Sequence, residues 1–284
     1  MKNLAILGPG LLGGSIALAT RERGSHRVAM WARRPAAVAE VEKRGIAARA
    51  SIDLREIVGD AAFVVLCVPI GAMPALARQI APMLSPETIV TDVGSVKAGV
   101  CAQLGGIFRG RVRFVGSHPM AGSDQTGLDF ARADLFKGTV SVVTPDESSD
   151  PGAVAEVEGF WEALGSRVMH VAPAEHDRLV ALVSHLPHVL AAALVNTVTA
   201  ENARAFELCG PGFRDTTRVA GGPPEMWAEI LSANRGAVRE GVEAVIEKLR
   251  EIATLLDRDR SMTDLLTQAK SQRDRLRLPQ PPHA

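Results

Sequence analysis

Short apolar runs alternate with stretches of helical spacing through the first half of the chain. Buried strands are predicted at residues 4–7, 28–31, 63–68, 88–91, 113–115 and 140–143. Amphipathic helices are predicted between them, for example over residues 36–44 and 73–83. This alternation predicts an α/β domain with a parallel sheet covered by helices on both faces. A helix at 153–164 and a strand at 167–170 complete the domain.

The pattern changes after about residue 172. Residues 176–198 are rich in Ala and Leu, and residues 235–256 and 262–276 repeat helical spacing with mixed charges outside. No strand pattern follows. We therefore predict an α/β domain at 1–172 and an all-helical domain at 173–284. The apolar stripes of the helical domain exceed what one subunit covers, which favours a homodimer through this domain.

Composition narrows the class of partner. Hydrophobic residues make up 46% and charged residues 23% of the 284 residues, as in a globular protein with a sizeable core. The 32 basic and 32 acidic side chains balance to a formal net charge of zero. No basic excess favours nucleic acid or an anionic membrane surface. We expect a small-molecule substrate that is bound by local charges.

The cysteines and the N-terminus bear on location. Cys67, Cys101 and Cys209 are odd in number and form no C-x-x-C pair, which argues against a disulfide framework or a zinc site. The chain enters its first strand at once, without the apolar segment of a signal peptide, and shows no run of 18 apolar residues. These features predict a cytoplasmic protein without a membrane span. We expect no bound metal.

A glycine-rich turn joins the first predicted strand to a helix. Gly8, Gly10 and Gly13 form a G-x-G-x-x-G motif whose variable positions include Leu11 and Leu12. The first glycine permits a tight turn, the second lets the backbone approach a pyrophosphate, and the third lets helix and strand pack closely. The helix N-terminus then faces the phosphates. The motif predicts a Rossmann-type dinucleotide-binding domain.

The end of the second strand indicates which dinucleotide is bound. NAD-binding domains carry a carboxylate there for the ribose hydroxyls, but this chain has Arg33 and Arg34. Two guanidinium groups suit a 2′-phosphate, so we predict NADP, with NAD as the alternative. The arginines are otherwise a solvated pair that opens the next helix. Val68 and Pro69, which end another strand, are expected to contact the cofactor.

Candidate chemistry gathers at the predicted carboxyl edge of the sheet. The strings 91–97 (TDVGSVK) and 117–122 (SHPMAG) each end a predicted strand, and such edges bind ligands in this class of fold. His118 lies in the second string, and imidazole accepts a proton near neutral pH. A dehydrogenase that oxidises an alcohol needs such a base beside the nicotinamide. Two more strings, 184–188 (SHLPH) and 212–218 (GFRDTTR), lie in the helical part.

Together these strings resemble the prephenate/arogenate (cyclohexadienyl) dehydrogenase family of tyrosine biosynthesis, in order and over essentially the whole chain. The resemblance implies a Rossmann domain followed by a helical dimerisation domain. It also implies oxidative decarboxylation of a cyclohexadienol to a phenol, with hydride transfer to NAD or NADP. The preference between prephenate and arogenate stays open, and we expect activity on at least one and lean toward both.

The resemblance also implies roles for individual residues. His118 matches the base that accepts the proton of the substrate hydroxyl, and Ser95 matches a serine that orients the imidazole and that hydroxyl. Arg218 matches the arginine that binds a substrate carboxylate, with Arg214 four residues earlier on the same helical face. Further matches are His185 and His188, which reach the pocket from the helical domain, and Asp124, which pairs with the arginine as a gate.

Structural alternatives accompany several of these assignments. Ser95 is also a candidate N-cap of a helix that starts near Val96. His185 is equally a residue of the N-cap region before Pro187, which suits the first turn of a helix. Arg214 is equally an ion-pair partner of Asp215 or a neighbour.

For Lys97, contact with the cofactor and a place on a solvated helix face are both open. His118 is otherwise a histidine that holds a loop, and His170 and His176 read as structural. Two other functions compete with the main one. One is a β-hydroxyacid-type dehydrogenase, and the other is a non-catalytic NADP-binding regulator.

Overall fold

The computed structural model describes residues 2–122, 125–257 and 261–276. Its larger sheet has six parallel strands in the order β3-β2-β1-β4-β5-β6. The strands are β1 (Lys2–Leu7), β2 (His26–Trp31), β3 (Arg49–Ser51), β4 (Phe63–Leu66), β5 (Ile89–Asp92) and β6 (Arg113–Phe114). The strand order reverses between β1 and β4, where doubly wound folds bind ligands. The sequence pattern missed the short β3.

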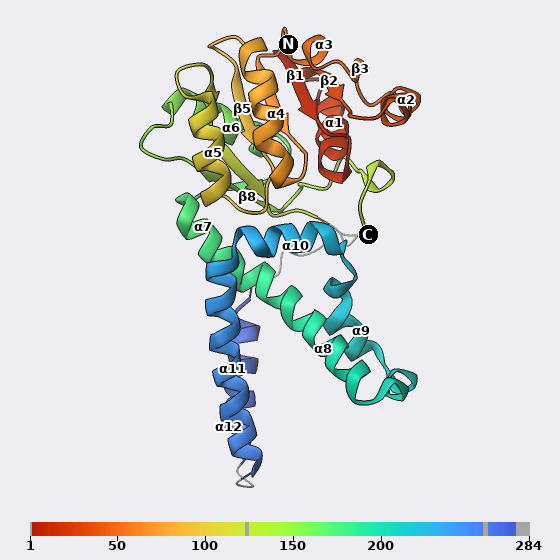
Figure 1. Cartoon of the computed structure of the whole chain (residues 1–284), viewed down its shortest axis with the longest axis vertical. Helices are drawn as coiled ribbons and strands as arrows, with labels where there is room; N and C mark the ends of the chain where they lie inside the picture. The colour runs from red at the N-terminus through yellow and green to blue at the C-terminus, as the bar shows by residue number, and fades with distance from the viewer. Residues whose placement is uncertain (1, 123–124, 258–260, 277–284) are drawn as a thin grey trace.

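Helices cover both faces of this sheet, as predicted (Figure 1). They are α1 (Leu11–Arg23), α2 (Pro35–Lys43), α3 (Leu54–Val58), α4 (Met73–Ile80), α5 (Ala98–Phe108) and α6 (Pro151–Ala163). Leu4 and Ile6 face one apolar cluster, which includes α1 and α6, and Ala5 and Leu7 face the other, which includes α4 and α5. Since successive strand residues point to opposite faces, the continuous apolar run of β1 suits a strand that is buried on both sides.

A second, smaller sheet corrects part of the sequence interpretation. It contains β7 (Gly116–Pro119), β8 (Val140–Thr144) and β9 (Arg167–His170), with β7 antiparallel to β8. The chain therefore changes sheets at Val115, and His118 lies inside β7, opposite Val142, rather than after the end of a strand. Gly116 permits this change because a Cβ there would lie 2.4 Å from the Cys101 sulfur.

Helices make up the second half of the chain, in agreement with the prediction. They are α7 (Pro173–Val180), α8 (Leu186–Asn202), α9 (Pro211–Thr217), α10 (Pro224–Ala233), α11 (Arg235–Asp257) and α12 (Thr263–Asp274). A π-helical turn, Ala181–His185, joins α7 to α8 within the single helix that the sequence predicted. Short 3-10 turns lie at Ile70–Ala72, Ala81–Met83, Leu128–Phe130, Ala203–Leu208 and Arg218–Gly221.

In Figure 1, α10 lies across the sheet domain, while α8 and α11 extend away from it as two arms. The segment Pro173–Leu208 is long and apolar enough to cross a membrane by length and composition alone. A stretch of 18 residues within it has a mean hydropathy of 1.7, and a third of that stretch is buried. Its exposed apolar side chains include Leu182, Val183, Leu190 and Leu194. The same segment places three buried histidines and Asp177 against the rest of the protein. Its apolar surface thus fits a helix that packs against protein.

Candidate active site

A cavity of about 530 Å³ lies between the carboxyl edge of the large sheet and the helical part. The sheet domain contributes the glycine-rich turn and the ends of β4, β5 and β7. The helical part contributes the π turn and α10, including His185 and Trp227. Ser95 and His118 both line this cavity, so the structure brings together two strings that lie far apart in the sequence.

The glycine-rich turn has the shape that a dinucleotide requires. Gly8 has a φ of +119°, and a Cβ there would lie 2.4 Å from the Cys67 carbonyl oxygen. A Cβ on Gly13 would lie 2.0 Å from the Gly8 carbonyl oxygen. By contrast, Gly10 precedes α1 and has nothing within 4 Å of its Cβ position, so the helix N-terminus is open to an approaching phosphate. These residues fit a dinucleotide.

The neighbouring cofactor candidates lie around this turn. Leu11, Leu12, Val68 and Pro69 line the cavity together with Gly10. Arg33 and Arg34 follow β2 and are exposed, and neither forms an ion pair within the part of the chain that the structure describes. Arg34 occupies the N-cap position of α2 without a side-chain cap bond. The charge pattern at the end of β2 is therefore cationic, as the sequence indicated.

His118 is a buried imidazole with one ring nitrogen already engaged. Its Nδ1 lies 2.9 Å from Nε2 of His176, which comes from α7. Because His118 also lines the cavity, Nε2 is the nitrogen left for a ligand. Burial lowers the pKa of His118 well below its ordinary value of 6.5, and His176, Lys97 and His185 lower it further. The ring is therefore neutral at pH 7, as a general base requires.

Lys97 is fully buried and does not line the cavity, so the interpretation of this residue as part of a solvated helix face is wrong. Its ammonium donates to the Asp92 carboxylate and, at 2.9 Å, to the Ser117 carbonyl oxygen. Asp92 also accepts from the backbone N–H groups of Gly94 and Ser117. The ion pair thus fixes the two cavity-lining strings against each other. Contact between Lys97 and the cofactor stays a prediction.

Ser95 is half-buried and faces the cavity, but the capping alternative is wrong. Helix α5 begins at Ala98, its N-cap position is Lys97, and the Asp177 carboxylate accepts from both of those backbone N–H groups. Within the described residues the Ser95 hydroxyl makes no hydrogen bond to His118. The imidazole is instead held by His176. A contact between Ser95 and the substrate hydroxyl stays a prediction.

The two histidines expected from the helical part lie close to Trp227 but differ in position. His185 lines the cavity, and its Nδ1 lies 3.2 Å from the Asn234 amide nitrogen. His185 occupies the N-cap position of α8 but makes no side-chain cap bond. Burial lowers the pKa of His185 to about 4. His188 is not among the cavity-lining residues and stacks on Trp227 with ring centroids 3.7 Å apart.

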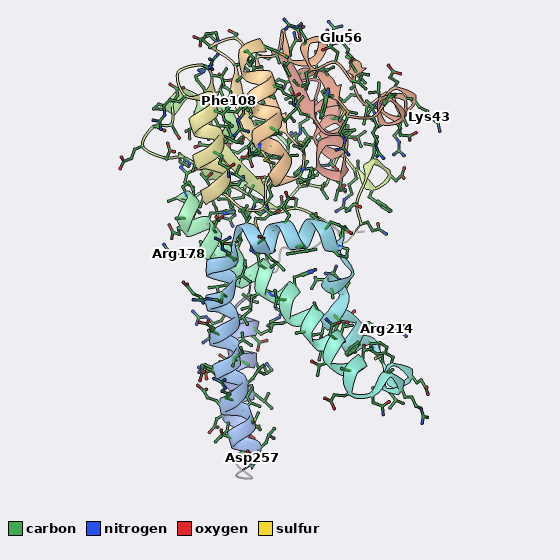
Figure 2. All side chains as sticks on the ribbon, in the orientation of Figure 1. Lys43, Glu56, Phe108, Arg178, Arg214 and Asp257 are labelled. Carbon is green, nitrogen blue, oxygen red and sulfur yellow. The ribbon has the colours of Figure 1, made fainter. Side chains whose placement is uncertain are left out.

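The predicted carboxylate-binding arginines lie outside the described cavity wall. Arg214 is on α9 and points outward (Figure 2), and it forms no ion pair with a carboxylate of residues 2–122, 125–257 or 261–276, so its ion-pair alternative is wrong. Arg218 is exposed and follows α9 directly. Asp124, the predicted gate, lies outside the described residues. Substrate binding by these three residues stays a prediction.

Sequence reasoning missed His176 and Asp177 as parts of the site, because it treated His176 as structural. The only signal was their position, three and four residues after the predicted start of the helical domain at residue 173. It also missed Trp227, which lines the cavity from the unpredicted helix α10. Among the described residues no cluster of three or more His, Cys, Asp and Glu side chains is arranged to hold a metal ion.

The glycine-rich turn lies at the switch point of a parallel sheet and is open to a phosphate, and a neutral buried imidazole lies beside it. This combination defines a dehydrogenase that uses a nicotinamide dinucleotide. Comparison with known families agrees. The model of the prephenate dehydrogenase nucleotide-binding domain matches residues 16–170, and that of the prephenate dehydrogenase dimerization domain matches residues 172–270. The chain belongs to the prephenate dehydrogenase family.

Individual relatives support this assignment. The cyclohexadienyl dehydrogenase of Zymomonas mobilis is 32% identical over 90% of this chain and 88% of its own. The crystal structure of Aquifex aeolicus prephenate dehydrogenase in complex with hydroxyphenyl propionate and NAD+ is 30% identical and superposes with a TM-score of 0.90, covering 96% of this chain and 97% of that one. The Synechocystis arogenate dehydrogenase structure is 32% identical with a TM-score of 0.83, covering 96% and 99%.

Proposed function

We propose that the protein oxidatively decarboxylates prephenate and arogenate, and that it passes the hydride to a nicotinamide dinucleotide. The observation that carries this proposal is the position of His118. Its Nε2 is available in a cavity that also contains the open turn at Gly10. Family membership favours this reaction over a β-hydroxyacid-type dehydrogenase, and over a non-catalytic NADP-binding regulator.

The chemistry assigns clear tasks to the residues of the chain. The bound dinucleotide supplies the hydride acceptor. His118 Nε2 accepts the proton of the ring hydroxyl as hydride leaves the same carbon, and the electrons of the ring-to-carboxylate bond complete the aromatic ring as carbon dioxide departs. Aromatisation makes the overall reaction strongly favourable. The chain therefore mainly positions the reactants and removes one proton.

The preferred cofactor is NADP in this proposal, with NAD as the alternative. Support comes from Arg33 and Arg34, which follow β2 where NAD-binding domains carry a carboxylate. Guanidinium groups bind phosphate through charge-assisted, bidentate hydrogen bonds. Ala32, which lies between the end of β2 and the two arginines, is buried, and its methyl side chain offers no acceptor for the ribose hydroxyls.

Use of both substrates is proposed because the two differ only in the side chain, a keto acid in prephenate and an amino acid in arogenate. Relatives at similar identity include an arogenate, a prephenate and a cyclohexadienyl dehydrogenase. We propose that Arg218 and Arg214 bind carboxylate, that His185 and His188 contribute from the helical part, and that Asp124 pairs with the arginine. A homodimer through the helical domain, residues 173–284, and a cytoplasmic location complete the proposal; the three cysteines are free thiols.

Steady-state kinetics with both substrates and both cofactors tests these assignments. We expect 4-hydroxyphenylpyruvate or tyrosine to form with equimolar reduced nucleotide, and kcat/KM to be higher with NADP. The substitution His118→Asn removes the base, and we expect kcat to fall by about 10²-fold or more while cofactor affinity is retained. His170→Asn, on the exposed end of β9, is the matched control. Turnover that survives His118→Asn would overturn the proposal, and a strong preference for NAD would overturn the assignment of Arg33.

A further inference from the structure

A chain of three side chains links the catalytic cavity to the helical part of the protein. His118 Nδ1 lies 2.9 Å from His176 Nε2, and His176 Nδ1 lies 2.8 Å from the Asp177 carboxylate. His176 is 1% exposed, and its ring packs edge-on against that of His118. His118 comes from β7, whereas the other two residues come from the first turns of α7. The contact therefore forms only when the two parts of the chain are together.

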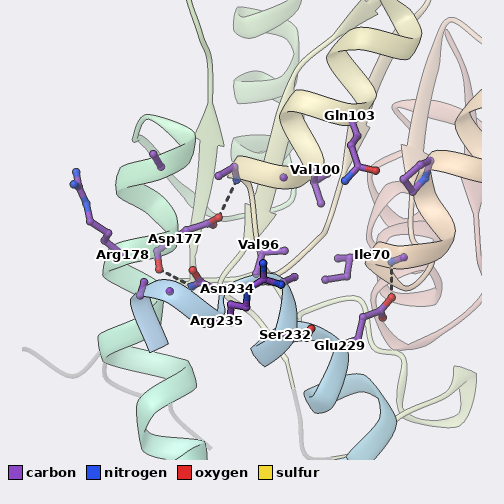
Figure 3. A pocket seen from close by; sticks show the side chains of 18 residues that line it. Ile70, Val96, Val100, Gln103, Asp177, Arg178, Glu229, Ser232, Asn234 and Arg235 are labelled. Carbon is purple, nitrogen blue, oxygen red and sulfur yellow. Dashed lines mark hydrogen bonds between the residues drawn. The ribbon is translucent and has the colours of Figure 1, made fainter. Parts of the chain in front are cut away.

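Several hydrogen bonds hold Asp177 in place, so it is a fixed end for the hydrogen-bonded chain of His118, His176 and Asp177. One carboxylate oxygen accepts from the Lys97 backbone N–H at 2.6 Å, and the other accepts from that of Ala98 at 2.9 Å. The amide of Asn234 donates to the Asp177 backbone carbonyl at 2.7 Å. Figure 3 shows Asp177 between the start of α5 and Asn234, at the edge of a second cleft. A carboxylate held in this way is a hydrogen-bond acceptor on a rigid support.

Asp177 is ionised over the working range of pH. Burial raises its pKa, but the hydrogen bonds from His176 and from the two backbone N–H groups outweigh that effect, and the pKa lies below its ordinary value of 3.8. An ionised carboxylate only accepts hydrogen bonds. His176 must therefore carry its proton on Nδ1, the nitrogen that faces Asp177.

This assignment fixes the proton on the next ring. A neutral imidazole has one N–H and one lone pair, so a proton on Nδ1 leaves the lone pair of His176 on Nε2. That lone pair accepts from His118, which must then carry its own proton on Nδ1. We propose that His176 and Asp177 are positioning residues that hold His118 in the one tautomer whose Nε2 lone pair faces the cavity. Nε2 is the atom that accepts the substrate proton, so this inference rests on the proposed function.

The same hydrogen-bonded chain also stabilises the protonated form of His118. When His118 accepts a proton on Nε2, its Nδ1–H continues to donate to His176, and the Asp177 carboxylate lies at the far end of the chain. No second proton transfer is needed. The other charged and titratable groups that act on His118 are the buried Lys97 ammonium beneath β7, paired with Asp92, and His185 in the π turn. Asp177 is thus the anion that the hydrogen-bonded chain directs toward the imidazolium.

The tautomer is measured directly by ¹⁵N NMR of protein labelled at histidine, at pH 7, with His118→Asn used to assign the signals of His118. We expect a protonated Nδ1 and an unprotonated Nε2 on His118 in the wild-type protein. We also expect this pattern to be lost in His176→Phe, which keeps a ring of similar size but has no hydrogen-bond acceptor. A His118 signal with the proton on Nε2 in the wild-type protein would overturn the proposal. This readout requires no turnover, so its failure is distinct from failure of the proposed function.

Kinetics provide the second readout. We expect His176→Phe to lower kcat by at least about 10-fold, toward the roughly 10⁴-fold loss that follows when a catalytic histidine is held in the wrong tautomer. The KM values and cofactor affinity should change little. His176→Gln keeps an acceptor at the position of Nε2 and should recover a large part of kcat, and His170→Gln is the matched control. Equal losses in the Phe and Gln variants with folding intact, or no loss in either, would contradict the positioning role.

Discussion

Lys97 and Asp92 form an ion pair in which neither side chain has any exposed surface, directly beneath the strand that carries His118. Two charges are removed from water there, and this costs free energy unless each charge keeps its partner and its remaining hydrogen bonds. Asp92 satisfies this condition through Gly94 and Ser117, and Lys97 satisfies it through the Ser117 carbonyl. The pair joins the end of β5 to β7, which are neighbours in space but belong to different sheets.

Removal of one partner should therefore destabilise the protein strongly. We expect Lys97→Met to lower the free energy of unfolding by roughly 3–5 kcal/mol, because the Asp92 carboxylate is left buried without its counter-ion. Urea unfolding followed by circular dichroism measures the change. Lys270→Met breaks the exposed pair with Asp274 and is the matched control, with an expected loss of about 0–1 kcal/mol. Equal losses in the two variants would refute the structural role of the buried pair.

The glycine-rich turn separates cofactor binding from folding. Gly10 has an ordinary φ of −86° and open space around its Cβ position, so Gly10→Ala should leave the Tm unchanged. The added methyl group occupies the approach of the pyrophosphate, and we expect Kd for the dinucleotide to rise by at least about 10-fold. Calorimetric titration gives Kd. Gly13→Ala is the contrasting variant and should unfold at a lower temperature, because its methyl group meets the Gly8 carbonyl. Unchanged cofactor affinity in Gly10→Ala would place the phosphates elsewhere.

Acid should destabilise the fold through its histidines. Burial is the leading cause that lowers the pKa of His26, His118, His185 and His188 in the native state. Below pH 6.5 the unfolded chain binds protons that these native rings do not, so the free energy of unfolding decreases as the pH falls. For His185 the loss extends from pH 6.5 down to about 4.

The test is urea unfolding of the wild type and of His185→Gln at several values of pH between 6.5 and 4.5. One group contributes a slope of at most about 1.4 kcal/mol per pH unit, and the variant should lack the contribution of His185. The carboxylates of Asp146 and Asp177, whose pKa values are lowered, contribute at lower pH than this window. An identical slope in the two proteins would show that native His185 titrates as it does in the unfolded chain.

The local parts of the fold were predictable from the sequence because local chemistry determines them. The tight turn at Gly8 and the approach at Gly10 follow from a strand, three glycines and a helix in direct succession. His118 was predictable as a site residue from its place after a predicted strand, although the structure puts it inside β7 of the smaller sheet. The partition of the strands was not predictable, since β6 and β7 are separated only by Val115 and no turn sequence between them marks the change of sheet.

The contacts that complete the site depend on long-range packing. His176 meets His118 across 58 positions of sequence, and Asp177 caps α5 from 79 residues away. A single sequence gives no sign of such pairings, because each residue taken alone has the pattern of an ordinary helix start. The same holds for Lys97, for which the sequence left a solvated helix face and cofactor contact both open, whereas the ammonium is buried under β7.

Helix α8 has an apolar face that is partly exposed. Leu190 and Leu194 lie one helical turn apart and are 37% and 38% exposed, and Val183 in the π turn is 69% exposed. Apolar surface of this extent on one helix is typical of an interface between subunits.

We expect the wild-type protein to be a dimer by light scattering coupled to size-exclusion chromatography. The double substitution Leu190→Glu with Leu194→Glu should produce monomers, because it would bury four carboxylates across a twofold interface. Ile52→Glu, at an exposed apolar residue of the sheet domain, is the control and should remain dimeric. A monomeric wild type, or a double variant that stays dimeric, would exclude this face as the interface.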